Sequence, residues 1–156
     1  MCEAGLDGDP WAGRQPAMVY RDISFSEPMR QKLLAGSKTQ TRRVLTEKGI
    51  VCDVVVEGRA YTRGEVGTQE DVMCPYGVPG DRLWVRGLPD ILLEITAVRA
   101  ERLDSIGAAD ALAEGVGPGT DPVEGYKIIW DELIAARGFG WSENPLVWVI
   151  TFARLR

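Results

Sequence analysis

The segment Leu33–Leu45, LLAGSKTQTRRVL, concentrates polar side chains that could take part in proton transfer. Lys38 and Thr41 lie three positions apart, and Arg42 and Arg43 follow directly. A threonine hydroxyl can attack a carbonyl carbon when a neighbouring base takes its proton. Because the chain has no histidine, that base must be a lysine, a carboxylate, a tyrosine or a cysteine. The segment is therefore either a site of nucleophilic chemistry without imidazole or an ordinary charged loop.

Lys38 can act as a base only if its amine is uncharged for part of the time. Its pKa must then fall well below the ordinary value of about 10.4. Burial and nearby cations both lower a lysine pKa, and Arg42 and Arg43 could supply the cations. In an extended strand, however, Lys38 and Thr41 would point to opposite faces. Their cooperation requires a turn or bulge at Thr39–Gln40, directly after a glycine-containing stretch.

Length and composition are typical of one folded domain. The chain has 156 residues, of which 45% are apolar and 26% charged. Residues 1–18 are rich in glycine, proline and alanine and predict a flexible tail, so that residues 19–156 form a single domain. No apolar run is long enough to span a membrane, and no secretory signal pattern is present. Cys2, Cys52 and Cys74 are widely spaced and odd in number, which favours a reducing cytoplasm over a disulfide or zinc framework.

The charge is distributed unevenly along the chain. The net charge is −5, so the protein as a whole is not a strong binder of polyanions. A local basic surface on an acidic protein suits a small anionic ligand or one nucleotide better than a long duplex. The stretch from position 30 to 43 has no acidic residue and five basic ones, namely Arg30, Lys32, Lys38, Arg42 and Arg43.

Sequence periodicity predicts the elements that position this segment. A first helix is expected from a cap at Ser26 to Gly36, with Met29, Leu33 and Leu34 on its apolar face. A second is expected over Ile106–Glu114, after a cap at Asp104 or Ser105. A third is expected over Val123–Arg137, ending before Gly138. Strands are expected at Val51–Val56, Arg59–Thr62 (after a Glu57-Gly58 turn), Arg82–Arg86, Ile91–Leu103 and Leu146–Leu155, with Cys74–Asp81 as a loop.

The last strand is expected to be half-buried, because its apolar residues alternate. Leu146, Trp148, Ile150 and Phe152 would share the buried face. The order of elements contains no repeating βαβ unit. It therefore predicts an α+β protein with a mainly antiparallel sheet that could curve into a barrel.

Several fragments resemble the ASCH-domain proteins, especially their phage-encoded branch. They include SFSEPMRQKLLAGSKTQTRR, CPYGVPGDRLWVR, ILLEITAVRAERLDSIGAADALAEGV and YKIIWDELIAARGFGWSENPLVWVITFARL, and the likeness runs from about Ile23 to Leu155. The most specific parts are the PGDRLWVR strand and a Gly-x-Lys-x-x-Thr-x-Arg pattern formed by Gly36, Lys38, Thr41 and Arg43. The resemblance implies a PUA-like (ASCH) β-pseudobarrel with helices around its mouth.

One small bacterial ASCH family hydrolyses N4-acetylcytidine to cytidine and acetate, and its motif is similar to Lys38, Thr41 and Arg43. The resemblance implies Thr41 as nucleophile, Lys38 as base and Glu114, at the end of the helix after the long strand, as acid or base. This chain departs from the small amidohydrolases in its greater length and in the loops around CPYGVP and GFGWSENP. The pocket walls, and with them the substrate, are expected to differ.

Further residues are candidates for substrate binding. Arg43 could hold a phosphate, a base carbonyl or Glu114 itself, although it could equally form a structural ion pair. Arg42 is a second candidate. Trp141 and Asn144 could form one wall of a base pocket, by stacking and edge recognition, or could instead cap the barrel and form a turn. Tyr76 is a further pocket candidate. The residues expected to serve packing are Trp84, Trp130 and Trp148. The Cys74 thiol is expected to be buried or half-exposed, with no base nearby in sequence to make it a nucleophile.

Three functions remain open from the sequence. The first is an amidohydrolase acting on N4-acylated cytidine or a related modified nucleoside. The second is a non-catalytic module that binds RNA or a modified base, and the third is a metal-independent ribonuclease in which Lys38 stabilises phosphate charge. The expected partner is a modified nucleoside or RNA, with no membrane, no metal and no cofactor. A monomer is favoured, although the sequence leaves the oligomeric state open.

Overall fold

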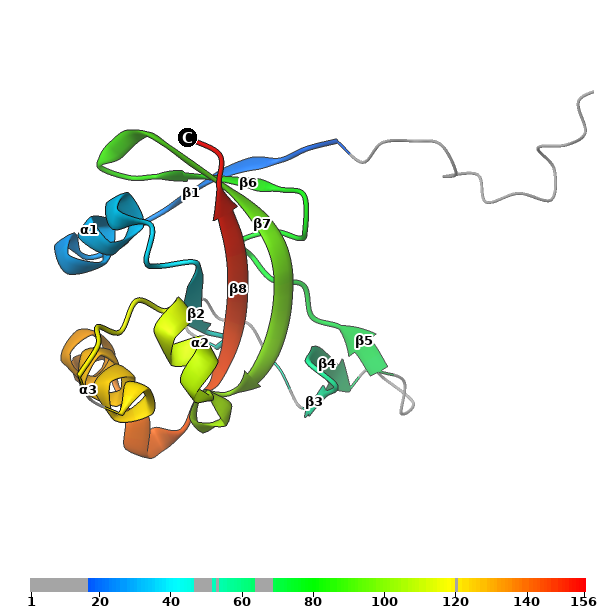
Figure 1. Cartoon of the computed structure of the whole chain (residues 1–156). Helices are drawn as coiled ribbons and strands as arrows, with labels where there is room; N and C mark the ends of the chain where they lie inside the picture. The colour runs from blue at the N-terminus through cyan, green and yellow to red at the C-terminus, as the bar shows by residue number, and fades with distance from the viewer. Residues whose placement is uncertain (1–16, 47–51, 53, 64–68, 120) are drawn as a thin grey trace, which may run out of the picture.

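A computed structural model describes residues 17–46, 52, 54–63, 69–119 and 121–156 of the chain (Figure 1). The expected tail, residues 1–18, therefore lies outside the described residues except at positions 17 and 18. The first half of the predicted strand Val51–Val56 also lies outside them, apart from Cys52. In the described part of the chain, no helix is long and apolar enough to cross a membrane.

Two β-sheets form the framework of the fold. The larger has the strand order β1 (Tyr20–Ile23), β6 (Arg82–Val85), β7 (Leu88–Arg102), β8 (Leu146–Arg154) and β2 (Gln40–Val44). The smaller contains β3 (Val54–Val56), β4 (Arg59–Arg63) and β5 (Gln69–Asp71).

All neighbouring strands are antiparallel except β1 and β6, which run parallel. The outer strands β1 and β2 of the larger sheet do not pair with each other in the described part of the chain, so this sheet stays open. The predicted α+β class with a mainly antiparallel sheet is confirmed. The Glu57-Gly58 hairpin turn is also present, and both of its residues have positive φ.

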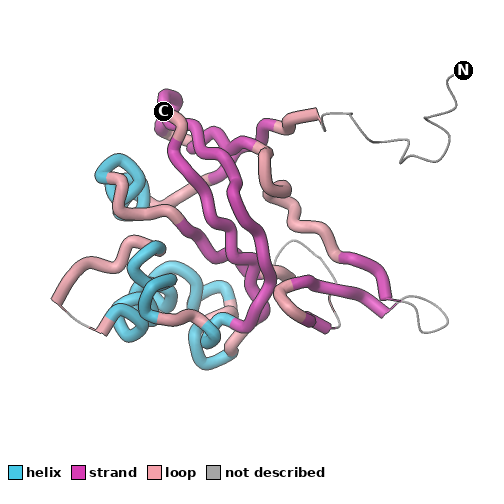
Figure 2. Tube along the Cα trace, turned by 45° about the vertical axis from the view of Figure 1, so that its right-hand side comes forward, coloured by secondary structure: helices cyan, strands magenta, loops and turns pink. Residues whose placement is uncertain are grey.

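Three helices pack against the larger sheet, the first on the face that also carries the small sheet and the other two on the opposite face (Figures 1 and 2). They are α1 (Glu27–Ala35), α2 (Ala108–Ala113) and α3 (Pro122–Ile134). Short 3-10 turns at Leu103–Ser105, Ala135–Arg137 and Trp141–Glu143 join α2 and α3 to the strands. This arrangement gathers the end of α1, the end of α2 and the start of β2 at one place.

The prediction that β8 is half-buried is wrong. Trp148, Ile150 and Phe152 pack into the core that contains α1, as expected. Val147 and Val149, on the opposite face, are also buried, because they pack against α2 and α3. Because β8 is covered on both faces, the alternation of residue types along the strand does not predict which of its side chains are buried.

Local differences concern helix ends and single side chains. Ser26 occupies the N-cap position of α1, but its hydroxyl makes no capping bond and is buried without a partner in the described part of the chain. Leu34 is exposed, whereas Met29 and Leu33 are buried. Helix α2 begins only after Gly107, because the chain first makes a 3-10 turn at Leu103–Ser105.

The tryptophans differ in their role. Trp130 and Trp148 are buried, as predicted, and so is the Cys74 thiol. Trp84 is not a core residue: strand β6 turns Leu83 and Val85 inward, so the indole lies half-buried on the outer face. It stacks there on Tyr20 with ring centroids 6.3 Å apart.

Candidate active site

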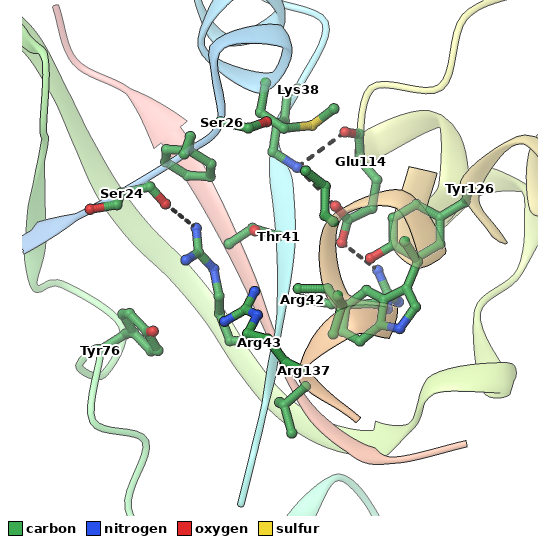
Figure 3. A pocket seen from close by; sticks show the side chains of 16 residues that line it. Ser24, Ser26, Lys38, Thr41, Arg42, Arg43, Tyr76, Glu114, Tyr126 and Arg137 are labelled. Atoms are coloured by element: carbon green, nitrogen blue, oxygen red, sulfur yellow. Dashed lines mark hydrogen bonds and ion pairs between the residues drawn. The ribbon is translucent and has the colours of Figure 1, made fainter. Parts of the chain in front are cut away.

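A pocket of about 540 Å³ lies between β2, the start of α1, the end of α2 and α3 (Figure 3). This volume is in the range of small-molecule sites. Its interior holds buried polar groups together with aromatic walls, and its mouth is more exposed. The lining residues include Phe25, Lys38, Thr41, Arg43, Glu114, Tyr126 and, at the mouth, Ser24, Tyr76 and Arg137.

Lys38 reaches the pocket because it lies outside strand β2. Helix α1 ends at Ala35, and the next residue, Gly36, has a φ of 79° that turns the chain so that the N–H of Ser37 bonds back to Lys32 O. Strand β2 begins only at Gln40, so the alternation of an extended strand does not apply to Lys38. Gln40 pairs regularly with Thr151, and Thr39 O accepts from Phe152 N–H, so the turn or bulge expected at Thr39–Gln40 does not appear in the strand pairing. Lys38 and Thr41 nevertheless line the same pocket.

The Lys38 ammonium is enclosed by three acceptors. Its Nζ donates to Gln40 O at 2.8 Å, to Glu114 O at 3.1 Å and to Glu114 Oε2 at 2.8 Å. The residue is 4% exposed. Burial is the main cause that lowers the pKa of Lys38 from its ordinary value, and the charges of Arg43 and Lys32 lower it further.

The Glu114 carboxylate opposes this shift by favouring the charged amine. Burial outweighs it, so the net direction is downward. The expectation that a nearby arginine lowers the Lys38 pKa holds for Arg43. Arg42 instead forms ion pairs with three carboxylates.

Glu114 is delivered by the end of helix α2. It is the C-cap residue of α2 and is 4% exposed. The next residue, Gly115, has a φ of 101°, and a Cβ there would lie 2.8 Å from Lys32 Cδ. Only glycine lets the chain turn so closely against α1. The Glu114 side chain thus points inward, where it joins Lys38 to Arg42.

Thr41 and Arg43 point into the pocket from alternate positions of β2. Strand β2 pairs with β8, with Thr41 opposite Ile150 and Arg43 opposite Trp148. Thr41 is buried. Figure 3 shows it between the Arg43 side chain and the Lys38–Glu114 pair. A threonine hydroxyl, an amine and a carboxyl group therefore share one concave site.

Arg42, expected as a substrate-binding residue, lines the pocket, but its guanidinium is buried among carboxylates. Its side chain has no exposed area and makes ion pairs with Glu114 at 3.1 Å, Glu101 at 3.3 Å and Asp110 at 3.4 Å. It also donates to Gln40 Oε1. With its charge shared among three carboxylates, it is not available to an anionic ligand.

Arg43 has different surroundings from its neighbour. Its Nη2 donates to Ser24 O at 2.6 Å, and its guanidinium lies over the rings of Phe25 and Tyr76 at 5.0 and 5.5 Å from their centroids. Burial lowers the pKa of Arg43, and the charge of Arg137 acts in the same direction. Tyr76, a predicted pocket residue, does line the pocket.

Trp141 and Asn144, expected as one wall of a base pocket, do not line the pocket that holds Lys38, Thr41 and Glu114. Trp141 packs on the cluster formed by α2, α3 and β8, and its N–H donates to Asp131. Asn144 turns the chain into β8 with a φ of 44°, and its Oδ1 accepts from Asp104 N–H at 3.0 Å. Both side chains serve the turn that starts the last strand.

Sequence reasoning missed several pocket residues. Tyr126 has the spacing of the apolar face of α3, but its hydroxyl hydrogen-bonds Glu114, and burial raises its pKa well above the ordinary value. For Arg137 the available sequence signal is its position as a basic residue at the end of a predicted helix, directly before Gly138. Ser24 and Phe25 carry no local signal, because the fold alone brings the segment before α1 to the pocket.

Comparison with known proteins identifies the fold. The structure is similar to an ASCH domain from Lactobacillus crispatus, with 16% identity, a TM-score of 0.54 and coverage of 87% of this chain and 79% of that one. It is also similar to protein EF3133 of Enterococcus faecalis, assigned to family DUF984, with 16% identity, a TM-score of 0.54 and coverage of 90% and 82%. No protein-family model and no curated protein matches the sequence.

The chain therefore has the fold of the ASCH domains, as the sequence resemblance predicted. At this level of identity the likeness establishes the fold, and the pocket must supply the argument for function. Among the described residues, no three cysteine or carboxylate side chains are grouped as metal ligands would be.

The lowered pKa of Lys38 predicts that stability rises with pH. Between the folded-state pKa of Lys38 and its unfolded value of 10.5, the unfolded chain binds more protons, so the free energy of unfolding increases with pH. The stability that Lys38 contributes above pH 10.5 decreases as the pH falls, and it is lost once the pH passes below the folded-state pKa. We expect a slope of at most about 1.4 kcal/mol per pH unit from this residue.

Urea denaturation between about pH 7 and 9.5 measures this slope. The range stops there because burial raises the pKa of Tyr126, so ionisation of its phenol in the unfolded chain lowers stability near pH 10. Lys38→Met is expected to flatten the profile. Parallel profiles for the two proteins would contradict the shift.

Proposed function

We propose that the pocket hydrolyses an amide on N4 of a modified cytidine, releasing cytidine and a carboxylic acid. The observation that supports this most is the buried Lys38 amine with a lowered pKa, in one pocket with Thr41 and Glu114. Few physical reasons exist to bury a lysine beside a hydroxyl and a carboxyl group in an open pocket, and perturbed amines mark catalytic sites in many proteins. The resemblance to N4-acetylcytidine amidohydrolases at Lys38, Thr41 and Arg43 agrees with this chemistry.

The first step forms an ester on Thr41. The Thr41 oxygen attacks the acyl carbon and its proton moves to the neutral Lys38 amine. The bond from the acyl carbon to N4 then breaks, and N4 takes a proton as cytidine leaves. Glu114 can deliver that proton, because its Oε2 lies 2.8 Å from Lys38 Nζ and the two groups can share it.

The second step releases the acid. Water attacks the acyl carbon of the ester, Lys38 takes a proton from the water, and Thr41 leaves with a proton returned to its oxygen. The proton balance closes because Lys38 alternates between the amine and the ammonium. Each turnover consumes one water and yields cytidine and acetate from N4-acetylcytidine.

The pair Lys38–Glu114 fits both protonation states. As an ammonium, Lys38 donates to Gln40 O, Glu114 O and Glu114 Oε2. As a neutral amine it can donate to the two backbone oxygens and accept from a protonated Glu114. Proton transfer therefore needs little rearrangement, which is the property required of a base and acid working in sequence.

A second function has one observation in its favour. The three acceptors around Lys38 would satisfy a permanently charged ammonium, and the aromatic rings of Phe25, Tyr76 and Tyr126 would still hold a base. In that case the pocket recognises a modified base without cleaving it. The PUA-like architecture agrees with both functions.

Mass spectrometry of purified protein incubated with a panel of N4-acylcytidines separates the two functions. The proposal predicts cytidine from at least one substrate, and Lys38→Met is expected to lower the rate by at least about 10²-fold. Lys127→Met is the matched control, since Lys127 lies on α3 and is not a lining residue of the pocket. Saturable binding with every ligand left intact would overturn the hydrolase and support recognition.

A further inference from the structure

A second cavity, of about 230 Å³, lies between the larger sheet and the small sheet with the loop that follows it. The larger sheet contributes Trp148 from β8 and Val98 from β7. Val72 and Val78, which follow β5 in the chain, line it from the other side. The proposed hydrolysis assigns no role to this cavity.

The indole N–H of Trp148 is the unusual feature of the cavity. Trp148 is 3% exposed, and its Nε1 has no hydrogen-bond partner among the described residues. The other buried indole satisfies its donor, since Trp130 Nε1 donates to Phe139 O at 2.9 Å. A buried donor without an acceptor costs stability, and buried tryptophans usually find a partner. The cavity that Trp148 lines is the side from which an acceptor can reach this N–H.

The rest of the lining favours an uncharged ligand. The charged residues among those that line the cavity in the described part of the chain, Arg59 and Asp71, form an ion pair with each other at 2.9 Å. The valine side chains at positions 72, 78 and 98 offer apolar contacts. One N–H donor between apolar side chains matches a flat ring that carries a carbonyl or a ring nitrogen as acceptor.

The second cavity is a neighbour of the pocket that holds Lys38. Arg43 lines that pocket and Trp148 lines the cavity, and the two residues are direct partners in the β2–β8 register. Directly opposed residues of an antiparallel pair share a face of the sheet, with Cβ atoms about 5 Å apart. The loop after β5 shows the same relation, because Tyr76 lines the pocket and Val78 lines the cavity. Two rings on adjacent units of one molecule suit sites that are neighbours in this way.

We infer that the second cavity is a nucleobase site, in which Trp148 Nε1–H donates to a carbonyl or ring nitrogen of the base. The choice of a nucleobase rests on the proposed function, which places a cytidine in the neighbouring pocket. The cavity and the unpaired N–H do not depend on that function. The base belongs either to the nucleotide next to the acylcytidine in a strand or to a separate nucleoside.

The indole N–H resonances of ¹⁵N-labelled protein test the site. Uracil, uridine and the dinucleotides CpU and UpC are titrated separately, and none of them has an acyl group to cleave. The Trp148 resonance, identified by its absence in Trp148→Phe, is expected to move downfield and to saturate with at least one probe. Trp130 lines the neighbouring pocket, so its indole resonance reports the filling of that pocket. An unmoved Trp148 resonance with every probe would overturn the site and leave water as the partner of the N–H.

A variant that fills the cavity checks where the probe binds. Val78→Phe is expected to abolish the shift of the Trp148 resonance, because Val78 lies at the rim, is 41% exposed and can be enlarged without entering the core. Val56→Phe is the matched control, since Val56 is 48% exposed on β3 and lines neither site. It is expected to keep the wild-type response. A full Trp148 shift in Val78→Phe would place the probe elsewhere and overturn the site.

Kinetics identifies the source of the base and separates this inference from the hydrolase. The value of kcat/KM is compared for N4-acetylcytidine and for CpU and UpC acetylated at N4. A base in the same strand predicts that one dinucleotide exceeds the nucleoside by about threefold or more, as one added hydrogen bond allows, and that Val78→Phe brings the ratio close to one. Equal values together with a Trp148 shift caused by uracil or uridine indicate a separate nucleoside.

The two proposals fail in different ways. A Trp148 shift without hydrolysis of any acylcytidine supports the nucleobase site and rejects the hydrolase. Hydrolysis together with an unmoved Trp148 resonance rejects the nucleobase site and leaves the hydrolase standing.

Discussion

Thr41→Val is expected to lower kcat for release of cytidine from N4-acetylcytidine by at least about 10³-fold, because it removes the proposed nucleophile. Valine keeps the β-branched shape that strand β2 needs opposite Ile150. The loss should therefore be one of chemistry and not of folding. Steady-state kinetics on wild-type and variant protein, with circular dichroism to compare folding, measures it.

Thr41→Ser is the matched variant, since it keeps a hydroxyl at the same position. It is expected to retain part of the activity. Acid-quenched samples of the wild-type protein should contain a species heavier by one acetyl group, and that species should be missing in Thr41→Val. If Thr41→Val kept its rate within about tenfold of wild type, water would be the direct nucleophile and Thr41 only part of the wall.

Arg42→Met is expected to lower the free energy of unfolding by about 3–5 kcal/mol. The Arg42 side chain has no exposed area and connects Glu114, Glu101 and Asp110. Its removal leaves Glu114, which is 4% exposed, with Lys38 as its remaining ion-pair partner among the described residues. Arg99 still pairs with Glu101 and Asp110, so the damage should centre on Glu114.

Urea denaturation at neutral pH measures this loss. Arg59→Met is the control, because the Arg59–Asp71 ion pair has both side chains largely exposed, at 65% and 49%. An exposed pair contributes at most about 1 kcal/mol. A loss in Arg42→Met no larger than in Arg59→Met would show that the Arg42 network does not hold the site together.

Part of the site could be predicted from sequence because it lies in one short segment. Lys38, Thr41 and Arg43 fall within six consecutive positions, shortly after the glycine that follows α1. Alternation along β2 also indicated that Arg42 and Arg43 face opposite sides. Their different environments, one enclosed by carboxylates and one stacked on aromatic rings, follow from that alternation.

The remaining residues could not be predicted in the same way, because tertiary packing selects them. Arg137, Tyr126 and Phe25 come from three separate elements, and nothing in their local sequence distinguishes a pocket wall from a core face. Trp141 and Asn144 had the composition of a base-binding wall, yet the turn before β8 uses both. Composition suggests chemistry, but the fold decides which side chains face the same cavity.

The fold shows the same division between local and tertiary information. The three helices and the Glu57-Gly58 hairpin follow from glycines and periodicity, although the side-chain caps expected at Ser26 and at Asp104 or Ser105 are not formed. The burial of both faces of β8 does not, because it depends on α2 and α3 packing against Val147 and Val149. The parallel pairing of β1 with β6 likewise joins segments far apart in the chain, and no local pattern encodes it.

The titration of the Lys38 amine tests the central claim most directly. The ¹³Cε resonance of Lys38, assigned by comparison with Lys38→Met, reports the charge of the amine as pH changes. The account predicts a midpoint clearly below 10.5, because burial outweighs the attraction of Glu114. A midpoint at or above 10.5 would mean a permanently charged Lys38 at working pH, and the amine could not serve as the base for Thr41.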